Sequence, residues 1–159
     1  MTMSFKPIFL LIMMFSGLQA AGQNPFLDSL KTTLSYTTSD TQRLRILNTL
    51  AQRGFALDAR QSIDFATEAQ SLAEKLLDSL ALLKAHYYRS ASYYLSGLID
   101  SALIHANLSL EIAQLTQEPS YLIDANNLLG TVISQSGDYT RALEYQLTAL
   151  HQAEIHQDS

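Results

Sequence analysis

The sequence predicts an all-α protein, a right-handed solenoid of antiparallel helix pairs. The first observation is a repeat, because Ser62, Ala102 and Ala142 recur at an interval of 40 residues. A fixed period in this range is typical of stacked helical units. The second is that apolar residues recur at three- and four-residue spacing, and the third is that only 3 Pro and 6 Gly interrupt the chain. Since solenoids usually bind other molecules, the fold class also favours a binding function.

Composition narrows the class of partner. The chain has 159 residues, a length typical of one domain, and a formal net charge of −5. An acidic balance without a cluster of Lys or Arg argues against a nucleic acid partner, because phosphates need a basic surface. The absence of cysteine excludes disulfides, thiolate metal sites and cysteine nucleophiles.

Residues 1–22 have the pattern of a secretory signal peptide. Lys6 precedes an apolar stretch, 8–15, and small residues follow it. The apolar stretch is about half the roughly 20 residues that a membrane span needs. A cleaved signal is therefore favoured over a membrane anchor, and no membrane span is expected in this chain. We predict cleavage between Ala20 and Gln23, with export to the periplasm or the extracellular space.

After the signal, the sequence predicts a spacer, 23–39, with a short leading helix over about 25–34. The first helix pair is expected to begin near Asp40, where Ser39 is an N-cap candidate. Apolar residues at helical spacing then predict its second helix over about 60–77.

Two further pairs follow with clear boundaries. The second is expected over about 79–96 and 100–116, because Gly97 can end a helix in the left-handed conformation. The third is expected from about Pro119, since proline suits a first helical turn, to 135 and then over 139–156. The three units therefore span about 40–78, 79–118 and 119–157.

The third unit resembles a tetratricopeptide repeat. Its Leu129-Gly130, Gly137-Asp138-Tyr139, Ala142 and Ala149 follow the order and spacing of that family's consensus. The resemblance covers about residues 40–157, and the interval of 40 residues in place of about 34 is similar to a subgroup with longer helices. It implies that Gly130 and Ala142 allow two helices to cross closely and that Tyr139 fills the gap at the turn.

The sequence offers no catalytic or metal-binding pattern. His151 and Glu154 share a helical face, but His156 points away from it, so the i, i+4 histidine pair of a helical zinc site is missing. His86 and His105 fall in different helices and are expected to pack between them. Without a nucleophile turn or a glycine-rich phosphate loop, neither an enzyme activity nor a cofactor nor a metal is expected.

The predicted binding residues lie on the first helix of each pair, which lines the concave side in the family that the chain resembles. By this resemblance the lining positions are Leu44, Leu47, Ala51, Gly54 and Phe55 in the first unit, Lys84, Tyr87, Ala91, Tyr94 and Leu95 in the second, and Asp124, Asn127, Thr131, Ser134 and Gln135 in the third.

These positions predict a peptide groove. Tyr87 and Tyr94 are seven residues apart, hence on one helical face with Lys84, and would anchor the peptide. Asp124, Asn127, Ser134 and Lys84 would supply polar contacts. The alternative is that the tyrosines merely cover the helix pair and that the polar residues are solvated. Only Lys84 and Asn127 resemble the Lys, Arg and Asn set with which co-chaperone members of the family hold a peptide carboxylate.

We therefore expect an exported scaffold that binds a protein or peptide. The alternative is the N-terminal sensory region of a longer kinase, cyclase or transcription regulator, because a signal, a short spacer and long-unit repeats resemble the front of bacterial sensor proteins. Leu143, Leu147, Leu150 and Ala153 form an apolar stripe near the C-terminus. We expect this stripe to contact further repeats or a second copy of the chain. Without such a contact, Ala149 and Ala153 would be expected to face water.

Overall fold

The computed structural model describes residues 24–157, which form seven α-helices and no strand. The predicted signal peptide and its cleavage site lie outside the described residues. The helices are α2 (Pro25–Tyr36), α3 (Asp40–Gly54), α4 (Ala59–Leu76), α5 (Ser79–Leu95), α6 (Ile99–Thr116), α7 (Pro119–Gln135) and α8 (Tyr139–Gln157).

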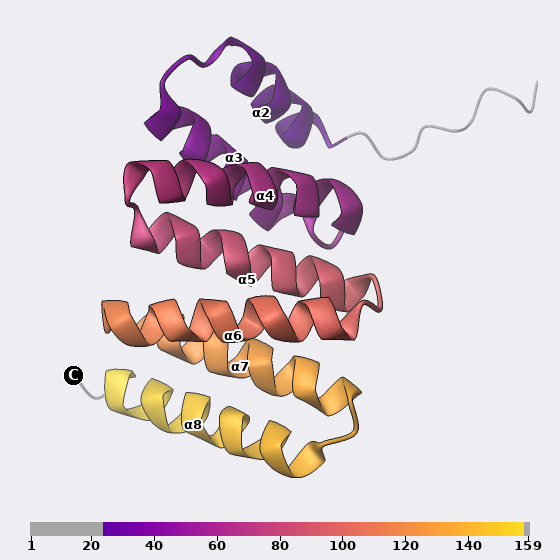
Figure 1. The fold of residues 1–159 in the computed structure, drawn as a ribbon, viewed down its shortest axis with the longest axis vertical. Coiled ribbons are helices and arrows are strands. Elements are labelled where there is room, and N and C mark those ends of the chain that lie inside the picture. The colour runs from indigo at the N-terminus through magenta and orange to yellow at the C-terminus, as the bar shows by residue number, and fades with distance from the viewer. Residues whose placement is uncertain (1–23, 158–159) are drawn as a thin grey trace, which may run out of the picture.

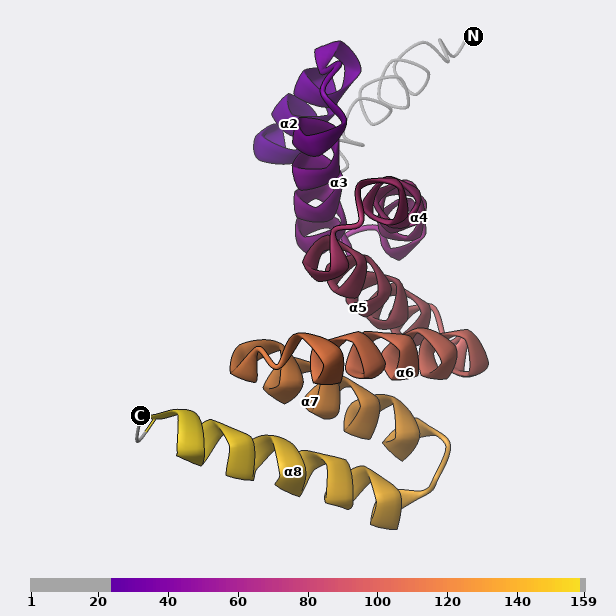
Figure 2. The same cartoon turned by 60° about the vertical axis from the view of Figure 1, so that its left-hand side comes forward.

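The helices stack in chain order along the long axis of the molecule, from α2 at one end to α8 at the other (Figures 1 and 2). Helices α3 and α4, α5 and α6, and α7 and α8 form the three predicted antiparallel pairs. Among the described helices, α2 contacts α3 alone. The second helices begin at Ala59, Ile99 and Tyr139, at the interval of 40 residues seen in the sequence. The predicted all-α solenoid is therefore confirmed.

The helix boundaries follow from local chemistry. The side chains of Asp58 and Asp78 accept hydrogen bonds from the backbone N–H groups of Gln61 and Ala81, capping α4 and α5. Gly97 adopts a φ of +73° after α5, the left-handed conformation expected of a glycine at a helix end. These caps hold the turns short, so that each helix folds back on its predecessor.

Small residues allow the paired helices to cross closely. A Cβ atom on Gly130 would lie 2.9 Å from the carbonyl oxygen of Ala142, closer than real Cβ atoms approach backbone. The predicted crossing of α7 and α8 at these residues is therefore confirmed. The prediction for Tyr139 is wrong, because its side chain is 73% exposed. As the first residue of α8 it projects beyond the crossing and has no helix to cover it.

Buried serines hold the earlier crossings. The Ser62 hydroxyl on α4 donates to the carbonyl oxygen of Ala51 at 2.9 Å, and Ser92 on α5 donates to Ser62 at 2.8 Å. Within the next pair, Ser90 donates to the carbonyl oxygen of Ala102 at 2.9 Å. These hydroxyls replace water for groups that no solvent reaches, so the polar contacts join successive helices.

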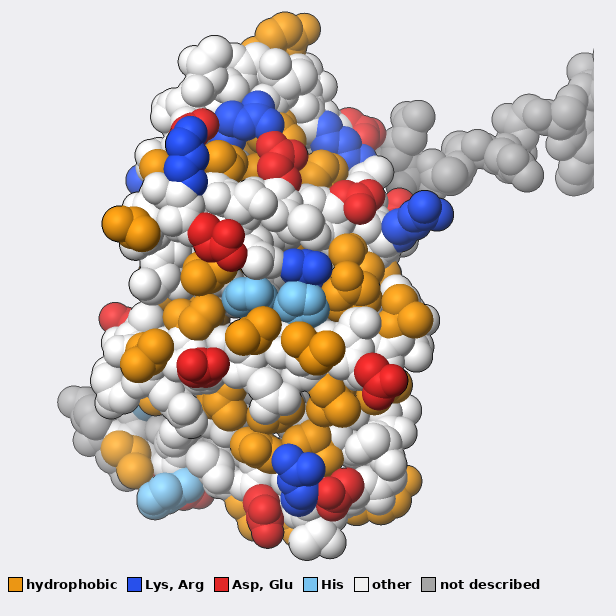
Figure 3. Space-filling model, viewed as in Figure 1, with side chains coloured by type: hydrophobic (Ala, Val, Ile, Leu, Met, Phe, Trp, Pro, Cys, Tyr) orange, Lys and Arg blue, Asp and Glu red, His pale blue; other side chains and the backbone are white. Residues whose placement is uncertain are grey.

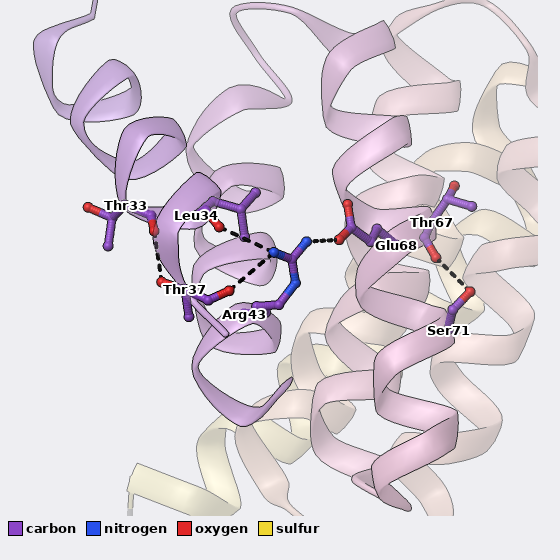
Figure 4. Close-up of polar contacts among 7 residues, drawn as sticks. All are labelled: Thr33, Leu34, Thr37, Arg43, Thr67, Glu68 and Ser71. Carbon is purple, nitrogen blue, oxygen red and sulfur yellow. Dashed lines mark hydrogen bonds and ion pairs between the residues drawn. The ribbon is translucent and has the colours of Figure 1, made fainter. Parts of the chain in front are cut away.

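An arginine ties the leading helix to the solenoid. Arg43 on α3 donates to the carbonyl oxygens of Leu34 and Thr37, at the end of α2, and also pairs with Glu68 on α4 at 2.5 Å (Figure 4). The guanidinium thus satisfies the free carbonyls at a helix C-terminus while bridging three helices.

The last helix differs from the others in its outer surface. Leu143, Leu147 and Leu150 are each more than half exposed, and α8 contacts α7 alone. The expectation that Ala149 would face water is wrong, because it is 1% exposed. Ala149 lies on the α7 side of the helix together with Ala142, whereas the leucines lie about a quarter turn or more further round it, on its outer side.

Candidate functional site

The first helices of the three pairs, α3, α5 and α7, form one side of the solenoid. Helix α5 contacts both α3 and α7, so side chains from all three helices can meet there. We call this surface the A-helix face. It contains the predicted binding residues, and it has two regions: an aromatic cluster over α5 and α7, and a groove between α3 and α5.

The aromatic cluster is built around Tyr88, which the sequence analysis did not select. Its ring stacks on Phe55, the residue that directly follows α3, with centroids 6.3 Å apart, and meets the edge of Tyr87 at 5.3 Å. The Lys84 ammonium lies 5.6 Å from the ring centroid of Tyr121 on α7. These contacts join three helices through half-buried rings, whose partial exposure leaves aromatic surface for another molecule.

The other predicted residues spread along α5 and α7. The Tyr94 hydroxyl accepts a hydrogen bond from the Gln135 side chain at 3.4 Å. Ser134 donates to the carbonyl oxygen of Thr131 at 2.7 Å in its own helix, so its hydroxyl proton is engaged. Asn127 is exposed on α7. The polar half of the predicted set therefore borders the tyrosines along α7.

The ionisable groups of the cluster share a desolvated environment. Burial raises the pKa of Tyr87, and the nearby charge of Asp124 adds to the effect. Burial also raises the pKa of Tyr88, reinforced by Tyr87 and Asp124. Partial desolvation raises the pKa of the Asp124 carboxyl. Both phenols thus remain protonated at neutral pH and can donate hydrogen bonds.

In the first unit, most of the predicted lining positions are wrong, and Phe55, half-buried beside Tyr88, is the exception. Leu44, Leu47 and Ala51 are at most 2% exposed. Helix α3 packs against three helices, α2, α4 and α5, and these contacts bury its apolar residues. A different face of α3 borders open space, and it is polar.

That polar face and α5 enclose a groove of about 310 Å³. Its walls include Arg45, Asn48, Thr49 and Gln52 from α3, with Lys84 and Tyr88 from α5. We call it the α3–α5 groove. Of the residues that the sequence analysis selected, Leu44 and Lys84 line it, and Leu44 is 2% exposed. The missed residues carried a signal, because Arg45, Asn48, Thr49 and Gln52 follow three- and four-residue spacing on one helical face.

The most buried polar residue of the groove is Asn48, which is 8% exposed. Its Nδ2 donates to the carbonyl oxygen of Ala81 at 3.4 Å, whereas its Oδ1 is buried without a hydrogen-bond partner. Buried acceptors of this kind are uncommon in folded proteins. The groove therefore contains an unmet hydrogen-bonding requirement.

On the opposite side, between α5 and α6, lies a buried histidine pair. The Nδ1 atoms of His86 and His105 are 3.0 Å apart, and Tyr93 stacks on His105 at 5.5 Å. Two histidine side chains are visible side by side near the middle of the face formed by α4 and α6 (Figure 3). The expected packing of both histidines between helices is confirmed. Within residues 24–157, no three histidine or acidic residues gather as a metal site would require.

None of the described helices combines the length and the apolar character that crossing a membrane requires.

Comparison with known proteins identifies the fold. The crystal structure of the TPR domain of Arabidopsis FLU matches this chain with a TM-score of 0.68 and 19% sequence identity, covering 74% of this chain and 99% of that one. No protein-family model matches the sequence, and no curated protein matches it. The chain therefore has a tetratricopeptide-like helical solenoid fold.

Proposed function

We propose that this chain is an exported, non-enzymatic scaffold that binds an extended peptide or protein segment across its A-helix face. One observation carries the proposal. Half-buried aromatic rings gather on that face, where Tyr88 contacts both Phe55 and Tyr87. Lys84 extends this cluster to Tyr121 of α7. Rigid aromatic side chains with polar tips are the groups that most often anchor a partner at an interface.

The roles of the individual residues follow from their positions. Tyr87 and Tyr94 are the anchors, because each keeps part of its ring accessible and its hydroxyl available as a donor. Lys84, Asp124 and Asn127 border them with charge and amide groups that can hold a peptide backbone or its side chains. Ser134, whose proton is already engaged, would serve as an acceptor.

Peptide selection on the full chain tests this function. Peptides enriched from a displayed random library should bind the Tyr87→Ala, Tyr94→Ala double variant about 30-fold more weakly, since truncating an anchor typically costs about 2 kcal/mol. The control is Tyr36→Ala, because Tyr36 is 81% exposed on α2. Equal affinity of the double variant and the parent would exclude the aromatic cluster as the binding surface.

Export is proposed from Lys6, the apolar stretch 8–15 and the small residues after it. N-terminal sequencing of exported material should begin between Ala21 and Asn24. Retention in the cytosol with Met1 intact would contradict this proposal.

The second candidate function is that of the N-terminal sensory region of a longer bacterial signal-transduction protein, a kinase, cyclase or transcription regulator. It is favoured by the order of elements, with a signal-like segment and a short leading helix before repeats of 40 residues. Reading the gene beyond Ser159 tests it. A following membrane span and output module would support the sensor, and an immediate stop codon would exclude it.

A further inference from the structure

We propose that the α3–α5 groove binds an internal acidic residue of an extended peptide, taking its backbone N–H on Asn48 and its carboxylate on Arg45 and Lys84. This binding mode rests on the proposed peptide-binding function and names the chemistry that the peptide must carry. Three observations support this binding mode: a buried acceptor without a partner, two cations without counter-charges, and a cavity that joins them.

The orientation of the Asn48 amide is fixed by the protein. The carbonyl oxygen of Ala81, 3.4 Å away, can only accept, so the nitrogen of the amide must face it. Oδ1 is then the remaining atom, and it is buried without a partner. An entering N–H group that displaced the long side chains at the rim would satisfy this acceptor and recover the free energy lost by its burial. Every non-proline peptide residue carries such a donor.

The positive charge of the groove favours a carboxylate on the peptide residue that donates its N–H to Asn48. Arg45 and Lys84 both line the groove, and neither pairs with a carboxylate among residues 24–157. The one acidic side chain in its described lining, Asp78, is directed to the N-terminus of α5, where it accepts from the Ala81 N–H at 2.9 Å. A peptide carboxylate would therefore meet two cations.

The arrangement favours an internal acidic side chain over a C-terminal carboxylate. A terminal carboxylate placed at Oδ1 of Asn48 would face an oxygen atom and be repelled, because the amide N–H₂ is turned toward the carbonyl oxygen of Ala81. An internal Asp or Glu can offer its N–H to Asn48 and extend its carboxylate to Arg45 or Lys84. A volume of about 310 Å³ lies at the small end of ligand pockets, which suits one side chain and its adjoining backbone.

The test uses the full chain and a phage-displayed library of random linear peptides. Enriched peptides are resynthesised with acetylated N-termini and amidated C-termini, so that no terminal charge remains. Their affinities are measured by fluorescence anisotropy for the parent, Asn48→Leu, the Arg45→Gln, Lys84→Gln double variant and Asn107→Leu. Asn107 is the matched control, because it is exposed on α6 and its Nδ2 also bonds to a carbonyl, that of Leu103 at 2.8 Å.

We expect enriched peptides to carry an internal Asp or Glu. Asn48→Leu should weaken binding about five- to tenfold, the effect of one hydrogen bond. The double variant should weaken it several-fold and reduce its dependence on salt, whereas Asn107→Leu should bind like the parent. Arg45 is exposed, so the charge variants keep the test decisive if Asn48→Leu unfolds, which a thermal melt would reveal.

Other results would overturn the proposal. Peptides without acidic residues, or equal affinity for the charge variants, would exclude the groove as an acidic-residue site while leaving the aromatic cluster as the binding surface. Tighter binding of the free-acid form of a peptide than of its amidated form would assign the site to a terminal carboxylate. A selection that enriches no peptide would refute the peptide-binding function itself, and this binding mode with it.

Discussion

The middle and C-terminal helix pairs share one repeat plan but bring their helices together differently. Ser90 and Gly130 occupy the same point of the repeat, 40 residues apart. In the middle pair the Ser90 hydroxyl donates to the carbonyl oxygen of Ala102 at 2.9 Å. In the C-terminal pair a Cβ on Gly130 would lie 2.9 Å from the carbonyl oxygen of Ala142, so the two backbones are nearly in contact. The repeat thus requires small volume at the crossing, and the polarity of the contact varies.

This difference predicts where each pair is vulnerable. The middle pair also buries His86 and His105, whose Nδ1 atoms are in contact, so protonation of these side chains would disturb the pair. The C-terminal pair fills its interior with apolar residues such as Leu129 and Val132, both 0% exposed. The middle pair should therefore respond to pH and to the loss of hydroxyl groups, whereas the C-terminal pair should respond to changes in volume.

The largest expected effect is acid destabilisation of the middle pair. Burial, together with the nearby charges of Arg89 and His86, lowers the pKa of His105 from 6.5 to about 4. Burial and Arg89 lower the pKa of His86 too, with Glu74 on α4 opposing them. In the unfolded chain these histidines bind protons near pH 6.5, whereas in the folded chain they bind them only at lower pH. The free energy of unfolding is therefore greatest above pH 6.5 and falls as the pH is lowered toward 4, by about 3 kcal/mol for His105.

Urea unfolding at pH 7.5 and 4.5 measures this effect. The parent should lose about 2–3 kcal/mol more between these two pH values than the His86→Leu, His105→Leu double variant, which retains every carboxylate. Equal losses would assign the acid sensitivity to the carboxylates and not to the histidine pair.

The second prediction tests the C-terminal pair. Ala142→Leu places a large side chain at the crossing with Gly130 and should lower the free energy of unfolding by about 1–3 kcal/mol. The same change at exposed Thr140, two residues earlier, should alter it by less than about 0.5 kcal/mol. Equal urea midpoints for the two variants would show that the crossing tolerates volume.

The third prediction tests the polar crossing. Ser90→Ala removes the hydrogen bond to Ala102 and should lower the free energy of unfolding by about 1 kcal/mol. Ser71→Ala is the control, because the Ser71 hydroxyl is exposed on α4. A parent-like urea midpoint for Ser90→Ala would mean that the hydroxyl fills space without adding stability.

Local features of the fold, such as helix ends, could be predicted from the sequence. Features that depend on how one helix packs against several others could not. Gly97 and Pro119 define helix ends through their own backbone preferences, so their roles were evident. The burial of Leu47 and the exposure of Asn48 to the groove depend on how α3 meets α4 and α5 together, which the repeat phase alone does not define. Tyr139 was misassigned because a consensus position says nothing of which neighbouring helix is present to cover it.

The smallest expected effect concerns the outer face of α8, where the C-terminal pair differs most from the middle one. Leu143 and Leu147 are 55% and 54% exposed, so replacing both by Gln removes little buried surface from the single chain. At low micromolar concentration the free energy of unfolding should change by less than about 0.5 kcal/mol per substitution.

Self-association through this face, which the apolar stripe predicts, would give a different concentration dependence. The parent's melting temperature should then rise with protein concentration, because a partner that binds only the folded chain stabilises it by mass action. The Leu143→Gln, Leu147→Gln variant should lose that rise, since each leucine withdrawn from an interface gives up about 1.5–3 kcal/mol of burial. Sedimentation at two concentrations separates the cases. A parent that stays monomeric at both, with a constant melting temperature, would show that no second copy covers α8.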